Sequence, residues 1–225
     1  MTKLLTKKEV VACQFSSWYQ DFRNLNSDDE KNGHNNITMK SIIIPLPKEF
    51  IDYLLTDGVN LPIGATKLSS CAPTDKKEED GWSSDEEAIG NDHDDDDSSC
   101  DVEPQKVFHF PELNEQVTNA IEKLGGSVLP KLNWSSPKDA TWVNEGTMKC
   151  QTPGDVYLLL KSSDFVMYDI THAMDDTKIE EGEVETKNHQ GYELVLRKWC
   201  NLYASMEFRG FVNNHHLGMD LVYFV

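Results

Sequence analysis

The sequence lacks several features that would assign the protein to a secreted or membrane class. Its five cysteines are widely spaced and form no Cys-x-x-Cys pair, which argues against a disulfide framework or a zinc site and favours a reducing compartment. No stretch approaches the roughly 18 apolar residues of a membrane span, and the first residues lack the apolar core of a signal peptide. We therefore expect a cytoplasmic protein with no membrane partner.

Positive charge is also scarce, because 21 lysines and arginines stand against 39 acidic residues, giving a net charge of −18. Such a chain binds nucleic acid poorly, so we expect no nucleic-acid partner. Fourteen acidic residues and two lysines between Asp75 and Glu103 account for twelve of the eighteen net negative charges. Residues 61–104 also lack hydrophobic periodicity, and too little apolar surface is available to offset their ordering entropy. We predict a disordered acidic insert over 61–104, between ordered regions 1–60 and 105–225.

Motifs of the common catalytic and nucleotide sites are missing as well. Neither a Walker loop nor a GxGxxG is present, and no Ser-His-Asp or Cys-His pairing has supporting context. His215 and His216 are adjacent, so on a strand they would point to opposite faces and make a poor metal pair. From the residues alone we assign no catalytic group.

Hydrophobic spacing predicts helices and strands in both ordered regions. Thr6 and Glu9 form a capping box before one amphipathic helix that runs through "CQFSSWYQDFRNL", and a short buried strand follows at Ile42–Ile44. In the second region we expect a helix ending near Gly125, a strand at 127–132, a loop, and a further strand at 140–143.

The rest of the second region continues this mixture. Thr152, Pro153 and Asp155 mark a strong helix start, and "FVMYDI" fits a short helix or strand. Two alternating segments, "YELVLRKWC" and "MEFRGFV", are expected to pair with each other. Helices and strands in this order favour an α+β fold.

Charged side chains in the predicted strands are the main sign of a site. Two interpretations remain open at this point. One is an anion or nucleotide pocket, in which lysines and arginines neutralise phosphate beside a flat tryptophan. The other is a half-buried salt bridge on a sheet face, between Glu207 and either Arg197 or Arg209. The cations concerned are Lys131, Lys149, Arg197 and Arg209, with Trp134 and Trp199 as the aromatic candidates.

Several blocks of sequence, taken in series, resemble one family. "CQFSSWY", "KSIIIPLPKEFIDYLLTDG", "FPELNEQVTNAIEKLGGSVLPKLNWSSPKDATWV", "TMKC", "LLLKSSDF" and "ELVLRKWC…MEFRGFV" look like the cell division cycle protein 123 family, from about Lys8 to Val212. The resemblance implies a two-lobed fold similar to ATP-grasp enzymes, with ATP and Mg²⁺ bound between the lobes. It also implies an assembly factor without turnover, which binds the gamma subunit of translation initiation factor 2 so that its three subunits can join.

The resemblance also implies a set of site residues. "PKLNWSSPKDATW" would be a strand-loop-strand over the ATP phosphates, with Lys131 as the phosphate-contacting lysine. Arg197, Lys198 and Trp199 would line the adenine, and the "EFR" segment would form the nucleotide floor. The full nucleotide-binding set is Lys131, Asn133, Trp134, Ser136, Arg197, Lys198, Trp199, Glu207 and Arg209.

After "VNNHHLG" the sequence departs from the family pattern. The strands that carry the family's magnesium ligands have no counterpart here, so we assign no metal ligand and expect an ATP-grasp-like fold truncated in its C-terminal lobe. We expect a monomer whose residues 1–60 bind the partner. Two alternatives are an ATP-grasp-type ligase or kinase acting on a small substrate, and a truncated isoform without function.

Overall fold

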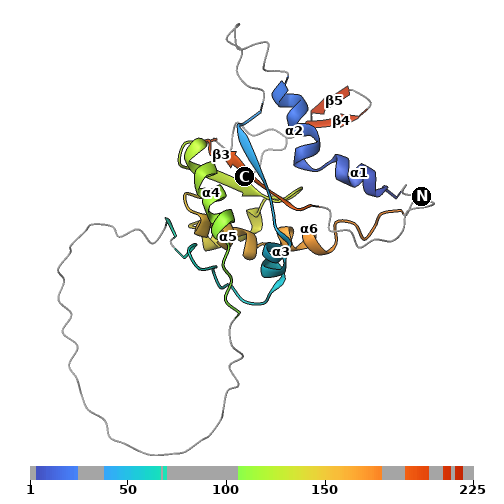
Figure 1. Ribbon diagram of the computed structural model, residues 1–225. Coiled ribbons are helices and arrows are strands. Elements are labelled where there is room, and N and C mark those ends of the chain that lie inside the picture. The colour runs from blue at the N-terminus through green and yellow to red at the C-terminus, as the bar shows by residue number, and fades with distance from the viewer. Residues whose placement is uncertain are drawn as a thin grey trace, which may run out of the picture.

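A computed structural model describes residues 4–24, 38–66, 68–69, 106–178, 191–202, 210–213 and 216–219 (Figure 1). The predicted disorder of the acidic insert concerns residues that lie, for the most part, outside these ranges. None of the helices within them is both long and apolar enough to cross a membrane.

A three-stranded antiparallel sheet joins the two ordered regions that the sequence suggests. Its order is β1 (Ser41–Pro45), β3 (Glu193–Lys198) and β2 (Val128–Lys131), so β3 lies in the middle. Val195 of β3 is opposite Ile43 on one side and Lys131 on the other. The strand predicted at 127–132 is confirmed, whereas β3 pairs with β1 and β2 rather than with "MEFRGFV".

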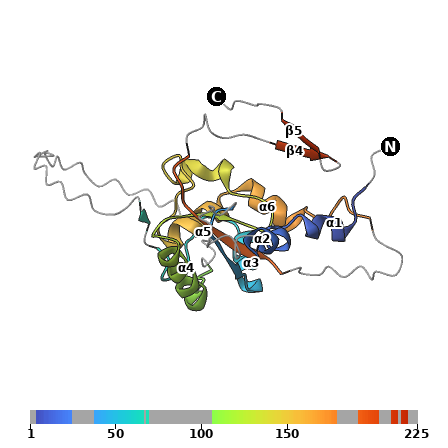
Figure 2. The ribbon, with the colours of Figure 1, turned by 90° about the horizontal axis from the view of Figure 1, so that it is seen from above.

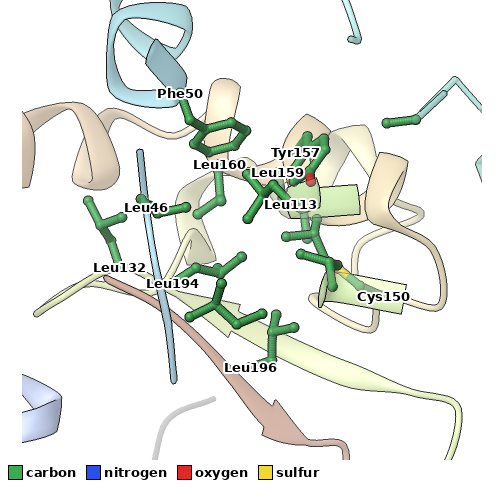
Figure 3. Packing of buried hydrophobic residues seen from close by; sticks show 14 of the residues in the cluster. Leu46, Phe50, Leu113, Leu132, Cys150, Tyr157, Leu159, Leu160, Leu194 and Leu196 are labelled. Carbon is green, nitrogen blue, oxygen red and sulfur yellow. The ribbon is translucent and has the colours of Figure 1, made fainter. Parts of the chain in front are cut away.

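One face of this sheet carries the main hydrophobic core (Figure 3). Leu194 and Leu196 point into it from β3 and are fully buried, as the two-residue period of a strand requires. Helices cover this face because each places an apolar stripe against it. These helices are α3 (Lys48–Leu55), α4 (Pro111–Lys123), α5 (Pro153–Lys161) and α6 (Asp164–Thr171).

The other face of the sheet is covered by α2 (Phe15–Asn24), which lies alongside β3 in Figure 2. Phe15 and Tyr19 pack there against Val195. The single helix predicted from Thr6 onward is wrong, since α1 (Lys7–Ala12) ends before α2 begins. The Phe15 N–H donates to the carbonyl oxygen of Asn133, at 2.9 Å, instead of continuing the helical ladder, and this contact fixes the break.

Two further strand predictions need correction. Residues 138–143 form a 3-10 helix, η3 (Lys138–Val143), and not a strand. Pro137 precedes this helix, and the Asp139 carboxylate accepts hydrogen bonds from Ser163 and Asp164 at the start of α6. The strand expected in "MEFRGFV" is described only from Gly210, where it is β4 (Gly210–Asn213), and its partner among the described strands is β5 (His216–Met219) rather than β3. The mixed helix and sheet content confirms the α+β prediction.

The predicted helix signals are largely confirmed. Thr152 and Asp155 form a capping box at the start of α5, and Thr6 and Glu9 form one at α1. Gly125 follows α4 with φ of 96°, a conformation in which a side chain would be strained. The segment "FVMYDI", which fits a short helix or strand by sequence, is helical and belongs to α6.

The start of the predicted insert is packed rather than solvated. Ile63 forms an isolated bridge with His109, and Ala65 is buried in the main core. The backbone N–H of Ser69 donates to the Asp155 carboxylate, at 2.9 Å. Residues 61–65 therefore belong to the folded body, since apolar side chains in this short run find partners that periodicity alone does not reveal.

Candidate functional site

Two cations meet on the sheet face that α2 covers. Lys131 of β2 is opposite Val195, and Arg197 of β3 is opposite Leu129, so the two cations are diagonal neighbours on one face. Both lie over the ring of Phe15, with Lys131 Nζ 5.9 Å and Arg197 Cζ 5.7 Å from its centroid. The structure therefore brings together two of the predicted nucleotide-binding residues, under an aromatic ring from α2.

The surroundings of Lys131 weaken its hold on a proton. Burial lowers its pKa from 10.5 to about 8, Asp169 partly opposes this shift, and the charge of Arg197 adds to it. Its Nζ also donates to the carbonyl oxygen of Trp134. An ammonium in this position gains from any further negative charge that comes near it.

Arg197 has unused hydrogen-bonding capacity. Burial lowers its pKa, and its Nε is buried without a hydrogen-bond partner among the described residues. A buried donor without a partner costs free energy, so an anion with a free oxygen would be favoured at this position. The alternative partner considered from the sequence, Glu207, lies outside the described residues, as does Arg209.

Asn133, in the loop that follows β2, forms side-chain hydrogen bonds to other segments of the chain. Its side chain is 1% exposed. The Nδ2 group donates to Gln14 Oε1 and to the Gly191 carbonyl, both at 3.3 Å, and Oδ1 accepts from the Glu193 N–H at 2.9 Å. These bonds tie the loop to the N-terminal helices and to β3. Asn133 thus has no side-chain group left to face a ligand in this conformation.

Trp134 anchors the same loop to α1. Its indole Nε1 donates to the Val10 carbonyl oxygen, at 3.0 Å, and the ring is only partly exposed. Ser136 is half-buried, and its carbonyl oxygen accepts from the Lys138 N–H at 2.8 Å. Trp134 therefore lies beside the cation pair through its backbone, while its ring is directed to the N-terminal helices.

Lys198 and Trp199 are separated from the cation pair. Lys198 is exposed and, one residue after Arg197 on β3, points to the opposite face, with its Cε near Gly125. The Trp199 indole Nε1 donates to Asn201 Oδ1, at 2.9 Å. The described residues thus do not bring Lys198 and Trp199 together with Lys131.

A carboxylate that sequence reasoning missed completes the site. Asp169 of α6 is 6% exposed, and it accepts from the Ser135 backbone N–H at 2.7 Å and from Ser135 Oγ at 2.8 Å. Burial raises the pKa of Asp169, while these hydrogen bonds and the charge of Lys131 act in the opposite direction. Its only sequence signal is an acidic residue three positions after the buried Val166, on the same side of a helix.

The described residues contain no group of three or more His, Cys, Asp or Glu side chains arranged to hold a metal ion. The donors that do converge, an ammonium, a guanidinium, a hydroxyl and backbone N–H groups, suit an anion rather than a cation.

A family model, described as D123, matches residues 31–218 of the chain. A relative from Botryotinia fuckeliana, named translation initiation factor eIF2 assembly protein, is 37% identical over 230 residues, which cover 98% of the chain and 49% of the relative. A relative from Phaeosphaeria nodorum, named cell division cycle protein 123, is 44% identical over 184 residues, 80% of the chain and 44% of the relative. The chain therefore spans about half the length of the curated relatives it matches.

A solved structure shares the fold. The chain superposes on Cdc123 from Schizosaccharomyces pombe with a TM-score of 0.63 and 34% identity, over 96% of the chain and 64% of that structure. At this level of identity and coverage, the arrangement of helices and strands described above is that of a known protein.

Proposed function

The chain belongs to the D123 family, and from this membership we propose that it takes part in the assembly of translation initiation factor eIF2. The observation that carries the proposal is the relative from Botryotinia fuckeliana, which is named as an eIF2 assembly protein and aligns with 98% of the chain. A relative from Xenopus tropicalis with the same name aligns with 95% of it, at 38% identity. Because the chain spans about half of these relatives, the activity of the whole protein is part of the proposal.

Within this role, we propose the gamma subunit of eIF2 as the direct partner, reached in the cytoplasm and bound without chemical turnover. The N-terminal helices suit such a contact, because α1 has no buried residue and Phe22 of α2 remains 42% exposed. An acidic chain, at −18 net charge, also favours a partner surface with positive charge.

Capture of the gamma subunit tests the assembly role. In one reaction, the tagged chain is mixed with purified gamma subunit, and we expect gamma to be retained on the tagged chain. In a second reaction, alpha and beta subunits are added as well, and we expect the yield of the three-subunit complex to be higher with the chain than without it. The full-length Xenopus tropicalis relative serves as the reference; if it retains gamma and this chain does not, the proposal fails for this chain.

We further propose that the chain binds ATP in an ATP-grasp-like manner, with Lys131 and Arg197 contacting its phosphates. The support is the pair of half-buried cations on one sheet face, together with the Nε of Arg197, which has no hydrogen-bond partner among the described residues. An oxygen of a phosphate group would satisfy this donor. The described residues do not supply a set of ligands for a protein-bound metal. Magnesium would arrive as the counter-ion of the nucleotide.

Calorimetric titration with ATP–magnesium tests the nucleotide role. Lys131→Met and Arg197→Met should each weaken binding roughly tenfold or more, since each removes one charge-assisted contact to phosphate. Lys48→Met is the matched control, because Lys48 is 60% exposed and forms an ion pair with Asp52 on the same helix. Equal affinity in all three variants would contradict the assignment, and steady release of phosphate from ATP would favour an enzyme instead.

A further inference from the structure

Several hydrogen-bond donors of the loop after β2 point at one carboxylate of the protein itself, that of Asp169. The backbone N–H and the hydroxyl of Ser135 both donate to the Asp169 carboxylate, at 2.7 and 2.8 Å. The backbone N–H of Trp134 also favours the charged form of this carboxylate, and so does the ammonium of Lys131. Two successive backbone N–H groups, a hydroxyl and a lysine thus converge on one buried anion.

This set of donors is the one that proteins use to bind phosphate. Successive backbone N–H groups form concavities for anions, and a lysine nearby adds charge. A carboxylate offers the same kind of acceptor oxygens as a phosphate group, with less charge. In the described structure, Asp169 therefore occupies the position that the donors of the loop would otherwise offer to an external anion.

Burial of the charged Asp169 carboxylate also costs free energy. Its side chain is 6% exposed, and its burial disfavours the charged form that the Ser135 hydrogen bonds require. A phosphate group with more charge, and with contacts to both Lys131 and Arg197, could take over these donors if the carboxylate withdrew. Lys131 would then exchange its bond to the Trp134 carbonyl for one to the phosphate.

We propose that Asp169 is an internal ligand of this anion site, and that a phosphate group must displace it from Ser135 in order to bind. The proposal rests on the ATP-binding role proposed above, and assigns a regulatory residue to that same site. The donors of the loop are then already in place but occupied by Asp169, and binding of nucleotide breaks the hydrogen bonds between the loop and α6.

The first test compares ATP and adenosine binding in wild type and Asp169→Asn. An amide is a weaker acceptor than a carboxylate and does not repel phosphate, so ATP affinity should rise about tenfold while adenosine affinity is unchanged. Asp139→Asn is the matched control. Asp139 likewise accepts from a serine hydroxyl and a backbone N–H, those of Ser163 and Asp164, but at the start of α6. Unchanged or weaker ATP binding by a folded Asp169→Asn protein would overturn the proposal.

A second test does not depend on ATP. Asp169→Ala leaves the donors of the loop without their internal acceptor, so inorganic phosphate should raise the melting temperature of this variant, with little effect on wild type. Phosphate that stabilises both proteins equally, or neither, would overturn the internal-ligand proposal. If phosphate acts on the variant alone while no protein binds ATP, the nucleotide role fails and the anion site stands.

Discussion

Lys131 lies among an aromatic ring, a second cation and a carboxylate, and each neighbour acts on the same ammonium group. Burial dominates and lowers its pKa to about 8, so a substantial part of the group is neutral in mildly alkaline solution. Binding of a phosphate would raise this pKa again. The charged form of Lys131 is thus stabilised less by the folded protein than by water.

This lowered pKa predicts a pH-dependent stability. The unfolded chain keeps the Lys131 proton up to about pH 10.5, whereas the folded chain loses it near pH 8, so between these values the unfolded state binds more protons. The free energy of unfolding of wild type relative to Lys131→Met should therefore rise between about pH 8 and about pH 10. Urea denaturation of wild type and Lys131→Met at several pH values measures this difference. A flat difference would mean that Lys131 keeps its ordinary pKa.

Sequence reasoning found part of this site and missed the rest for a physical reason. Lys131 is detectable from the sequence because its strand is otherwise apolar, and Arg197 because strand alternation places it on the same face as the apolar Val195. A charge beside apolar neighbours is costly to bury unless it is paired or meets a ligand. Asp169 was not detectable in this way. Its partner, Ser135, is far away in the sequence, and only the packing of α6 beneath the loop brings the two together.

At the scale of elements, helix starts were predicted well, because capping uses residues next to each other in the chain. The box at α5 has a second role that local sequence does not reveal. Asp155 accepts from the backbone N–H groups of Gln151 and Thr152, and also from Ser69 at the edge of the acidic insert. Long-range contacts similarly decide the break between α1 and α2, through the bond from Phe15 to Asn133.

The two capping boxes should therefore differ in their effect on stability. Asp155 is 1% exposed and accepts from three part-buried N–H groups, so Asp155→Ala leaves all three without this acceptor and should lower the free energy of unfolding by about 2–3 kcal/mol. Thr6→Ala in α1, which has no buried residue, should cost only about 0.5 kcal/mol. Urea denaturation followed by circular dichroism provides the comparison. Similar losses in the two variants would show that Asp155 acts as a local cap alone.

The ordered regions on the two sides of the acidic insert share one sheet, although composition separates them. Composition divides the chain at residues 61–104, yet β1 from before the insert pairs with β3 near the other end of the described chain. Hydrophobic patterns locate strands but do not say which strands pair, so the pattern predicts the wrong neighbour for β3. The α+β class was predictable, and the family relation gives its arrangement.

The open edge of β1 shows how the molecule limits contact with copies of itself. The Lys198 N–H donates to the carbonyl oxygen of Lys40, and the Leu46 N–H donates to that of Tyr192. In the alternating pattern of an antiparallel pair, the backbone N–H and C=O groups of Ser41, Ile43 and Pro45 therefore point away from β3. The Tyr19 hydroxyl pairs with both the N–H and the carbonyl of Ser41, and proline has no N–H. In the described part of the chain, Ile43 alone on this edge offers both a donor and an acceptor. A foreign strand would find too short a template to add to the sheet, which protects the protein from fibril-like growth at this edge.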